Sequence, residues 1–278
     1  MPTGAYRALK QYTGPLDAKQ IAEGMRAAIK NAQRLFRDAE TLVGLGRYPT
    51  ATALAILCLE ETGKVRLLRS FAWSRDEDDL DGHWRDFRKH TAKTVDAARW
   101  AFPGNLVEIA AEWRARGTPM TQEFLERASR RLASNLANSK HLPHRFEKAK
   151  QLAFYVDCLT DGDTAGPIWS EPMIASDRAR AEHYLETARK VVPVHDVDDR
   201  EVELWVRDVG QVARSVAGDP MDPADVIKFL EALATSINGY CSDAEALGVT
   251  TPWPMSLVRS LGDLVRIGVA TLKAAPPG

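Results

Sequence analysis

The sequence Ile21-Ala-Glu-Gly-Met25-Arg-Ala-Ala28-Ile29-Lys-Asn-Ala32-Gln-Arg-Leu35-Phe36 decides the fold class. Its apolar residues recur every three or four positions, which is the period of an α-helix with one buried face. Asp17 stands where it can cap this helix, and Gln20 completes a capping box. Gly44 and Gly46 then indicate where the helix ends.

The same helical period fills most of the remaining chain, and no segment alternates convincingly as a strand does. Helices are predicted at about 49–69, 83–101, 106–114, 119–136, 143–156, 176–192 and 199–217, with two more starting near 222 and 254. The acidic segment 76–81 and the Gly/Pro-containing segment 160–172 are predicted to be loops. We therefore expect an all-α protein with a helical bundle at 16–158 and a C-terminal helical extension at 174–273, packed on the bundle.

Composition and charge exclude some functional classes but do not point to any one of them. The net charge is −1, so overall charge gives no case for binding nucleic acid or a membrane. The three cysteines are far apart and form no CxxC pair, which favours neither disulfides nor a zinc knuckle and fits a reducing cytoplasm. No apolar run is long enough for a membrane span, and the first residues lack the apolar core of a signal peptide. We expect a cytoplasmic protein with no membrane contact.

The predicted second helix carries two adjacent carboxylates. On a helical wheel Glu61 falls about 20° from Leu54, inside the apolar stripe, whereas Glu60 falls to the side and can pair with Lys64. A carboxylate in an apolar stripe needs a partner or a proton, so Glu61 is predicted to be buried. Glu61 can form a structural ion pair across the bundle, or it can belong to an active site or an interface.

The predicted third helix carries the candidate chemistry, with Arg85 and His90 in a stretch rich in cations and aromatic residues. Cleaving RNA without a metal needs a group that moves protons near neutral pH, which suits histidine, and a cation for the phosphate, which suits arginine. In one ideal helix the two residues differ by about 140°, so they converge only across a helix end, through the reach of Arg85, or between two subunits. The alternative is a solvated basic helix face.

Other catalytic or cofactor-binding classes have little support in the sequence. His83 shares a helix face with His90, but no third ligand stands at helical spacing, so no metal site is predicted. Gly-rich phosphate loops, nucleophile elbows and HExxH motifs are absent, and no cofactor is predicted.

A second basic patch lies between residues 127 and 150, where Glu147 is the only acid. Such local clusters favour binding to the phosphate backbone of a nucleic acid. The alternative for any single residue is that it lies on a solvated helix face. The cations are Arg127, Arg130, Arg131, Lys140, Arg145, Lys148 and Lys150, with His141 and His144 among them.

Several blocks of the chain, spread over residues 25–190, resemble the AbiV family of abortive-infection proteins. The blocks are Asn31–Glu40, Gly46–Pro49, Ala53–Leu57, Glu60-Glu61-Thr62-Gly63-Lys64, the third helix with Trp84, Phe87, Arg88, His90 and Lys93, and Lys150–Asp157 followed by Trp169 and Pro172. That family looks like a branch of the HEPN superfamily, whose members are helical bundles, often dimeric, and in many cases ribonucleases. Their signature is an arginine followed after four to six residues by a histidine, often with a polar residue after the arginine; Arg85, Asp86 and His90 fit it.

The resemblance implies an HEPN-like bundle in which two copies of the motif meet at a homodimer interface. It also implies metal-independent RNA cleavage that leaves a cyclic phosphate, and growth arrest on phage infection. The expected catalytic residues are Arg85 and His90, with Glu61, Lys64 and Asp86 in support. Arg88, Lys89, Lys93, Arg145 and Lys148 are expected to bind RNA.

Three functional hypotheses follow. The first is an antiphage endoribonuclease that acts on tRNA, rRNA or mRNA and responds to a phage-encoded activator protein. The alternative is a non-catalytic HEPN-like protein that sequesters a translation component or a phage protein. A purely structural regulator without RNA contact is a third reading, which predicts no salt-dependent RNA binding.

Overall fold

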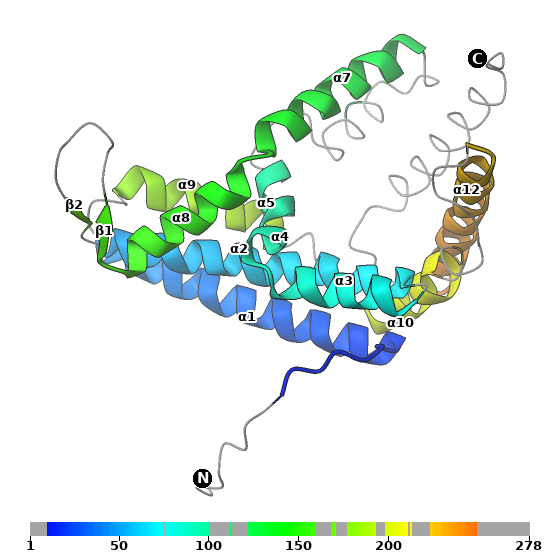
Figure 1. The fold of residues 1–278 in the computed structure, drawn as a ribbon, viewed down its shortest axis with the longest axis horizontal. Helices are drawn as coiled ribbons and strands as arrows, with labels where there is room; N and C mark the ends of the chain where they lie inside the picture. Colours follow the sequence, from blue (N-terminus) through cyan, green and yellow to red (C-terminus); the bar gives the residue numbers. More distant parts are fainter. Residues whose placement is uncertain are drawn as a thin grey trace, which may run out of the picture.

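Two long antiparallel helices form the centre of the molecule in the computed structural model (Figure 1). The structure describes residues 10–74, 76–100, 112, 122–159, 168–170, 177–192, 198–210, 212 and 223–248. Helix α1 spans Ala18–Gly44 and α2 spans Tyr48–Ser70. The predicted capping box is present at Asp17 and Gln20. The turn between the helices passes through Gly46, whose φ of 71° favours glycine.

The other described helical elements pack on this pair or on one another. They are the 3-10 turn Phe71–Trp73, α3 (Glu77–Arg88), α4 (His90–Lys93), α5 (Val95–Trp100), α7 (Gln122–Ser139), α8 (Leu142–Phe154), α9 (Arg178–Val191), α10 (Asp199–Leu204), the π-helical turn Trp205–Val209 and α12 (Pro223–Ala246). The protein is mostly helical, which confirms the predicted all-α class. Among the described residues, no helix is long and apolar enough to cross a membrane.

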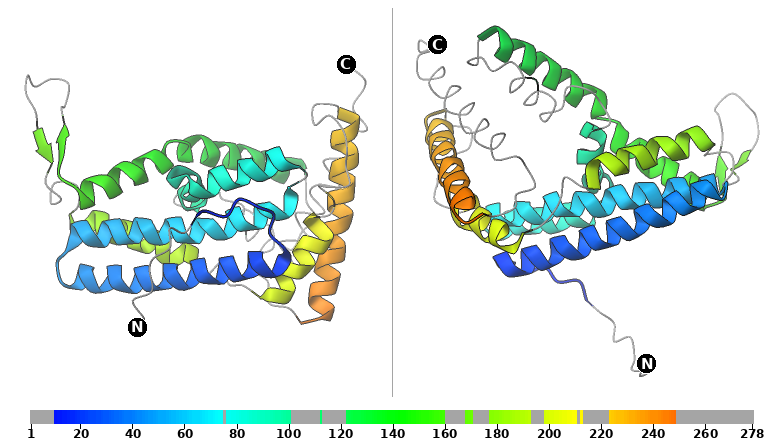
Figure 2. Two further views of the ribbon diagram at one scale, coloured as in Figure 1. Left: turned by 60° about the horizontal axis from the view of Figure 1, so that its bottom comes forward. Right: turned by 180° about the vertical axis from the view of Figure 1, so that it is seen from behind.

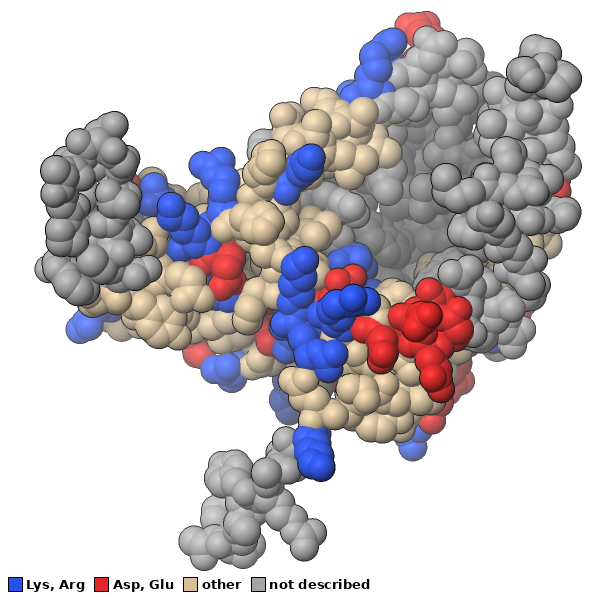
Figure 3. Space-filling view, in the orientation of Figure 1, with Lys and Arg blue, Asp and Glu red and all other residues tan. Residues whose placement is uncertain are grey.

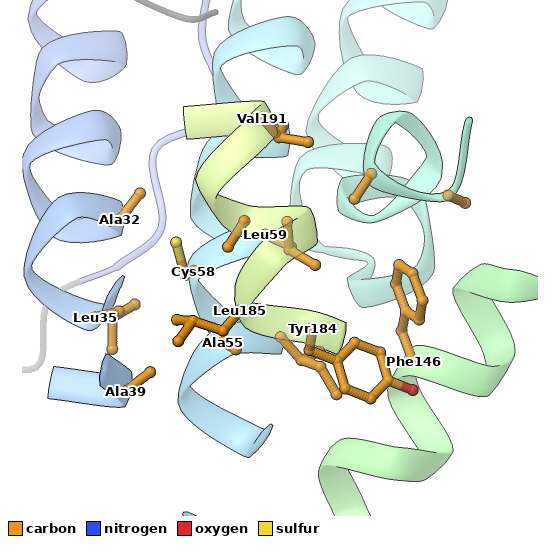
Figure 4. Close-up of a cluster of buried hydrophobic side chains, with 14 residues drawn as sticks. Ala32, Leu35, Ala39, Ala55, Cys58, Leu59, Phe146, Tyr184, Leu185 and Val191 are labelled. Atoms are coloured by element: carbon orange, nitrogen blue, oxygen red, sulfur yellow. The ribbon is translucent and has the colours of Figure 1, made fainter. Parts of the chain in front are cut away.

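The main core lies where α1, α2, α5, α8 and α9 meet (Figure 4). Phe146 of α8 packs edge-on against Tyr184 of α9, with 5.4 Å between ring centroids. Leu185, Ala188 and Val191 of α9 reach the same core. Helix α9, which the sequence assigned to the C-terminal extension, therefore contributes to the same core as the bundle helices.

A second core cluster closes the other end of the α1–α2 pair. Trp84 of α3 is its aromatic centre and packs at 4.5 Å from Phe71 and 5.6 Å from Phe87, measured between ring centroids. Its indole nitrogen donates to the Gly14 carbonyl at 3.1 Å. This cluster fixes α3 along α2. In Figure 2 the ribbon of α3 runs alongside that of α2.

The last described elements are joined to α2 by a buried ion pair. Glu201 of α10 is fully buried and accepts from both terminal nitrogens of Arg69, at 2.8 and 2.5 Å. Tyr240 of α12 donates to the same carboxylate at 2.5 Å. Because a buried carboxylate needs such partners, these contacts attach α10 and α12 to the end of α2.

Three local predictions were wrong. The acidic segment 76–81 is not a loop: Asp76 caps α3, and Glu77 to Asp79 fill its first turn, where negative charge suits the helix dipole. The predicted helix 83–101 is interrupted by the extended residue Lys89 and again after α4. The segment 160–172 includes β2 (Ile168–Ser170), which pairs antiparallel with β1 (Asp157–Leu159). The helices predicted at 106–114 and from 254 lie outside the described residues, apart from residue 112.

Candidate active site

Helices α2 and α4 approach each other at a point where only glycine fits. A Cβ atom added to Gly63 would lie 1.7 Å from the carbonyl oxygen of Lys93. Arg66, further along α2, donates to the Ala92 carbonyl at 3.0 Å and holds the same contact. Residues three apart on a helix share a face, so this approach also brings the start of α4 towards the preceding turn of α2.

Glu60 and His90 meet at that position. Glu60 lies one turn before Gly63 and is 3% exposed. Its Oε2 lies 2.7 Å from His90 Nδ1. The His90 side chain is 54% exposed, so one ring nitrogen is held by a buried carboxylate while the rest of the ring reaches solvent.

Lys150 of α8 completes the cluster. Its Nζ lies 2.5 Å from Glu60 Oε1, 2.7 Å from Glu147 Oε2 and 3.2 Å from His90 Nδ1. The lysine side chain is 6% exposed. Phe146, one turn earlier on α8, is buried in the main core, which explains why the lysine on the same face points inwards.

The charges in the cluster stabilise one another. Burial lowers the pKa of Lys150, but its hydrogen bonds to Glu147 and Glu60 outweigh burial and raise that pKa above its usual value. Burial alone would raise the pKa of the Glu147 carboxyl. Its hydrogen bonds with Lys150 and Gln151 outweigh burial and hold that pKa below its usual value. The lysine is therefore a fixed positive charge between carboxylates.

Donor atoms of Glu60, His90 and Glu147 all lie within 4.8 Å of one another, a spacing that could hold a metal ion. The Lys150 ammonium already makes ion pairs with both carboxylates, so it takes the position that a cation would need. We therefore assign no metal site to this cluster.

Arg85 lies on the last turn of α3, before the break at Lys89. Its side chain is exposed and makes no hydrogen bond or ion pair with the residues that the structure describes. The helix end between Arg85 and His90 removes the constraint of a single continuous helix, but no hydrogen bond or ion pair joins the two side chains within one chain.

A model of the family described as AbiV, of the HEPN type, matches residues 20–193. The chain belongs to the AbiV family. The match covers more than half of the chain, includes the whole Glu60–His90–Lys150 cluster and ends beside the end of α9. Neither the curated proteins nor the solved structures contain a match.

The structure corrects the prediction for the two carboxylates of α2. Glu60, not Glu61, is the deeply buried one, and Lys64 pairs with Glu61 at 2.7 Å rather than with Glu60. The wheel assumed one apolar stripe, whereas α2 is covered by α1, α9, α8 and α4 on several sides. Lys64 also lies over the Phe87 ring, 5.8 Å from its centroid.

The predicted RNA-binding residues fall into two groups. Lys93 is only 8% exposed, so its placement at an RNA surface was wrong: it forms part of the α2–α4 contact, and burial followed by the charge of Lys64 lowers its pKa. Arg88, Lys89, Arg145 and Lys148 are exposed. Arg88 donates to Gln11 at 3.3 Å.

Exposed cations gather in two areas of the face drawn in Figure 3, one at the C-terminal end of α3 and one over α8. Acidic side chains lie beside the first area, at the start of α3. Asp86 is exposed and its carboxylate pairs with no described residue. In the basic patch of 127–150, Arg127 and Arg131 pair with Glu112, and Lys150 is buried.

The sequence reasoning missed Glu60, Glu147 and Lys150 as site residues. A signal for two of them was present, because Glu60 opens the Glu60–Lys64 block and Lys150 opens the Lys150–Asp157 block that resemble the family. Nothing in the spacing revealed that these blocks meet, since 90 positions separate the two residues.

Proposed function

We propose that this AbiV protein is an abortive-infection endoribonuclease that cleaves cellular RNA without a metal ion and arrests growth on phage infection. The observation that carries the proposal is His90: its Nδ1 is held by the buried Glu60, and its ring is 54% exposed. A histidine held on one side by a carboxylate and open on the other suits general acid–base catalysis.

In the proposed reaction, His90 accepts the proton of a ribose 2′-hydroxyl while the 2′-oxygen attacks the adjacent phosphorus. The bond from phosphorus to the 5′-oxygen breaks, and that oxygen takes a proton from a protonated histidine. The products are a 2′,3′-cyclic phosphate and a free 5′-hydroxyl. Arg85 stabilises the additional negative charge on the phosphate oxygens.

The proposed enzyme is a homodimer. Arg85 makes no hydrogen bond or ion pair with the residues that the structure describes, His90 included, so we propose that a second copy that presents its own motif completes the site. Two copies also supply two histidines, one for each proton transfer. The exposed cations Lys89, Arg145 and Lys148 support binding of the RNA backbone.

The proposed setting is the cytoplasm, where cellular RNA is present, with a phage product as the trigger. The substrate class is tRNA, rRNA or mRNA. No cofactor enters the proposed reaction, because His90 and Arg85 supply the proton transfers and the positive charge.

A second candidate function is a non-catalytic protein that sequesters a translation component or a phage protein. The observation that favours it is that no hydrogen bond or ion pair joins Arg85 to His90 within one chain. Under this reading, growth arrest does not depend on proton transfer by His90.

The test compares wild type, His90→Ala and His144→Ala in phage-challenged cells, scoring growth arrest and the integrity of tRNA and rRNA. His144 is an exposed histidine of α8 without a described partner, so its replacement controls for the loss of a surface imidazole. We expect His90→Ala to lose both arrest and RNA breakdown at wild-type protein levels, and His144→Ala to retain both. Arrest with intact RNA in the His90→Ala strain would favour sequestration.

A further inference from the structure

The Glu60–His90 contact has a defined direction. An ionised carboxylate can only accept a hydrogen bond, so at 2.7 Å the proton between Oε2 and Nδ1 belongs to the histidine. If Nδ1 were unprotonated, its lone pair would face a carboxylate oxygen at hydrogen-bond distance. Lys150 Nζ also lies 3.2 Å from Nδ1, but its shorter contacts, at 2.5 and 2.7 Å, are to the carboxylates of Glu60 and Glu147. The closer Glu60 oxygen therefore decides the tautomer: in the neutral ring the proton is on Nδ1, and Nε2 has the free lone pair.

Lys150 determines which carboxylate oxygen of Glu60 is available to His90. Its ammonium group is a donor only, and at 2.5 Å it occupies Oε1 of the carboxylate. The other oxygen is thereby left for His90. Glu147, on the second side of the lysine, keeps the ammonium between the two carboxylates.

We propose that Glu60 and Lys150 are positioning residues, which hold His90 in the tautomer whose Nε2 is the reacting nitrogen. Neither side chain is open to RNA, because the Glu60 side chain is 4% and the Lys150 side chain 6% exposed. Their role in cleavage rests on the proposed function, but the tautomer itself can be measured without RNA.

The variant that separates this role from simple packing is Glu60→Gln. An amide NH2 turned towards the Lys150 ammonium would set donor against donor, so the carbonyl oxygen of the new amide faces the lysine and its NH2 group faces His90. That NH2 donates to Nδ1, and the ring proton moves to Nε2. Removing Lys150 as well, in Glu60→Gln/Lys150→Met, frees the amide to turn its oxygen towards His90 and restores part of the Nδ1–H population.

Nitrogen NMR of histidine-labelled protein reads the tautomer, with His90 assigned by its loss in His90→Ala. At a pH at which His90 is neutral, we expect Nδ1–H in wild type, Nε2–H in Glu60→Gln and a mixture in the double variant. Glu61→Gln removes a neighbouring α2 carboxylate whose one ion pair with a described residue is with Lys64, and should leave the His90 tautomer unchanged. Nε2–H in wild type would overturn the proposal, as would one common tautomer in wild type and Glu60→Gln.

The kinetic readout uses RNA cleavage by purified protein. A positioning role predicts a fall in kcat of roughly 10²- to 10⁴-fold for Glu60→Gln with little change in KM. An unchanged kcat in Glu60→Gln contradicts the positioning role. If His90→Ala cleaves as wild type does, the nuclease proposal itself fails; if only His90→Ala is inactive, the nuclease stands and the positioning proposal fails.

Discussion

The Cβ position of Gly63 lies 1.7 Å from the carbonyl oxygen of Lys93, so α2 and α4 meet where only a glycine fits. One turn earlier on each helix, Glu60 meets His90. Gly63, in the Glu60–Lys64 block, thus allows α2 and α4 to come close enough for the Glu60 carboxylate to contact His90.

Gly63→Ala is expected to destabilise the protein by about 1–3 kcal/mol or more, because the added methyl group forces α4 away from α2. His90 would then lose its carboxylate partner. Chemical denaturation measures the change in free energy of unfolding. Gly239→Ala is the control, since its added Cβ meets nothing within 4 Å in α12 and should be neutral or stabilise by about 0.5–1 kcal/mol.

Lys150→Met is expected to cost roughly 3–5 kcal/mol, because it leaves the buried Glu60 without its main counter-charge. Glu60→Gln/Lys150→Met should cost less than the sum of the two single changes, with a coupling of about 1 kcal/mol or more. Urea unfolding of the four proteins gives the double-mutant cycle. Additive effects would show that the two side chains do not interact as the structure has them.

Acidification should reveal the pairing of Glu147. Burial opposes ionisation of this carboxyl, but hydrogen bonds with Lys150 and Gln151 keep its pKa below the usual 4.5. Its folded-state pKa is therefore the lower one, so its contribution to stability is present above pH 4.5 and is lost as the pH falls through the folded-state pKa.

Glu147→Gln should lose less free energy of unfolding than wild type over that acidic range, in urea titrations at a series of pH values. Glu23→Gln, which replaces an exposed carboxyl of α1 without a described partner, should follow the wild-type curve. Parallel curves for wild type and Glu147→Gln would argue against the Lys150–Glu147 pair.

The Arg69–Glu201–Tyr240 network should control how firmly α10 and α12 stay attached to α2. Glu201→Gln weakens the bidentate pair with Arg69, and we expect faster amide hydrogen exchange in Asp199–Leu204 and in α12, with little change in α1. Glu203→Gln, an exposed carboxylate of the same helix, is the control. Equal exchange in both variants would mean that the ion pair does not hold these helices.

Much of the fold could be predicted from periodicity and caps. The bounds of α1 and α2 and the Asp17 capping box follow from local sequence, because amphipathic spacing and helix-end chemistry are local properties. The break at Lys89 could not be predicted, since no glycine or proline marks it and the Gly63–Lys93 approach that accompanies it is a long-range contact.

The candidate site shows the same division. His90 was found from its chemistry and the family motif, but its partners come from α2 and α8, which sequence spacing does not bring together. The sequence predicted Glu61 as the buried carboxylate of α2, whereas Glu60 is the buried one. The prediction assumed a single buried stripe, which suits a surface helix, but α2 is packed on several sides.

The most direct test of the nuclease proposal is the chemistry of RNA ends in phage-challenged cells. Attack by a 2′-oxygen leaves 2′,3′-cyclic phosphates, so sequencing selective for these ends should show sites that appear after challenge with wild type and His144→Ala and are absent with His90→Ala. Equal cyclic-phosphate ends with wild type and His90→Ala would contradict catalysis by His90.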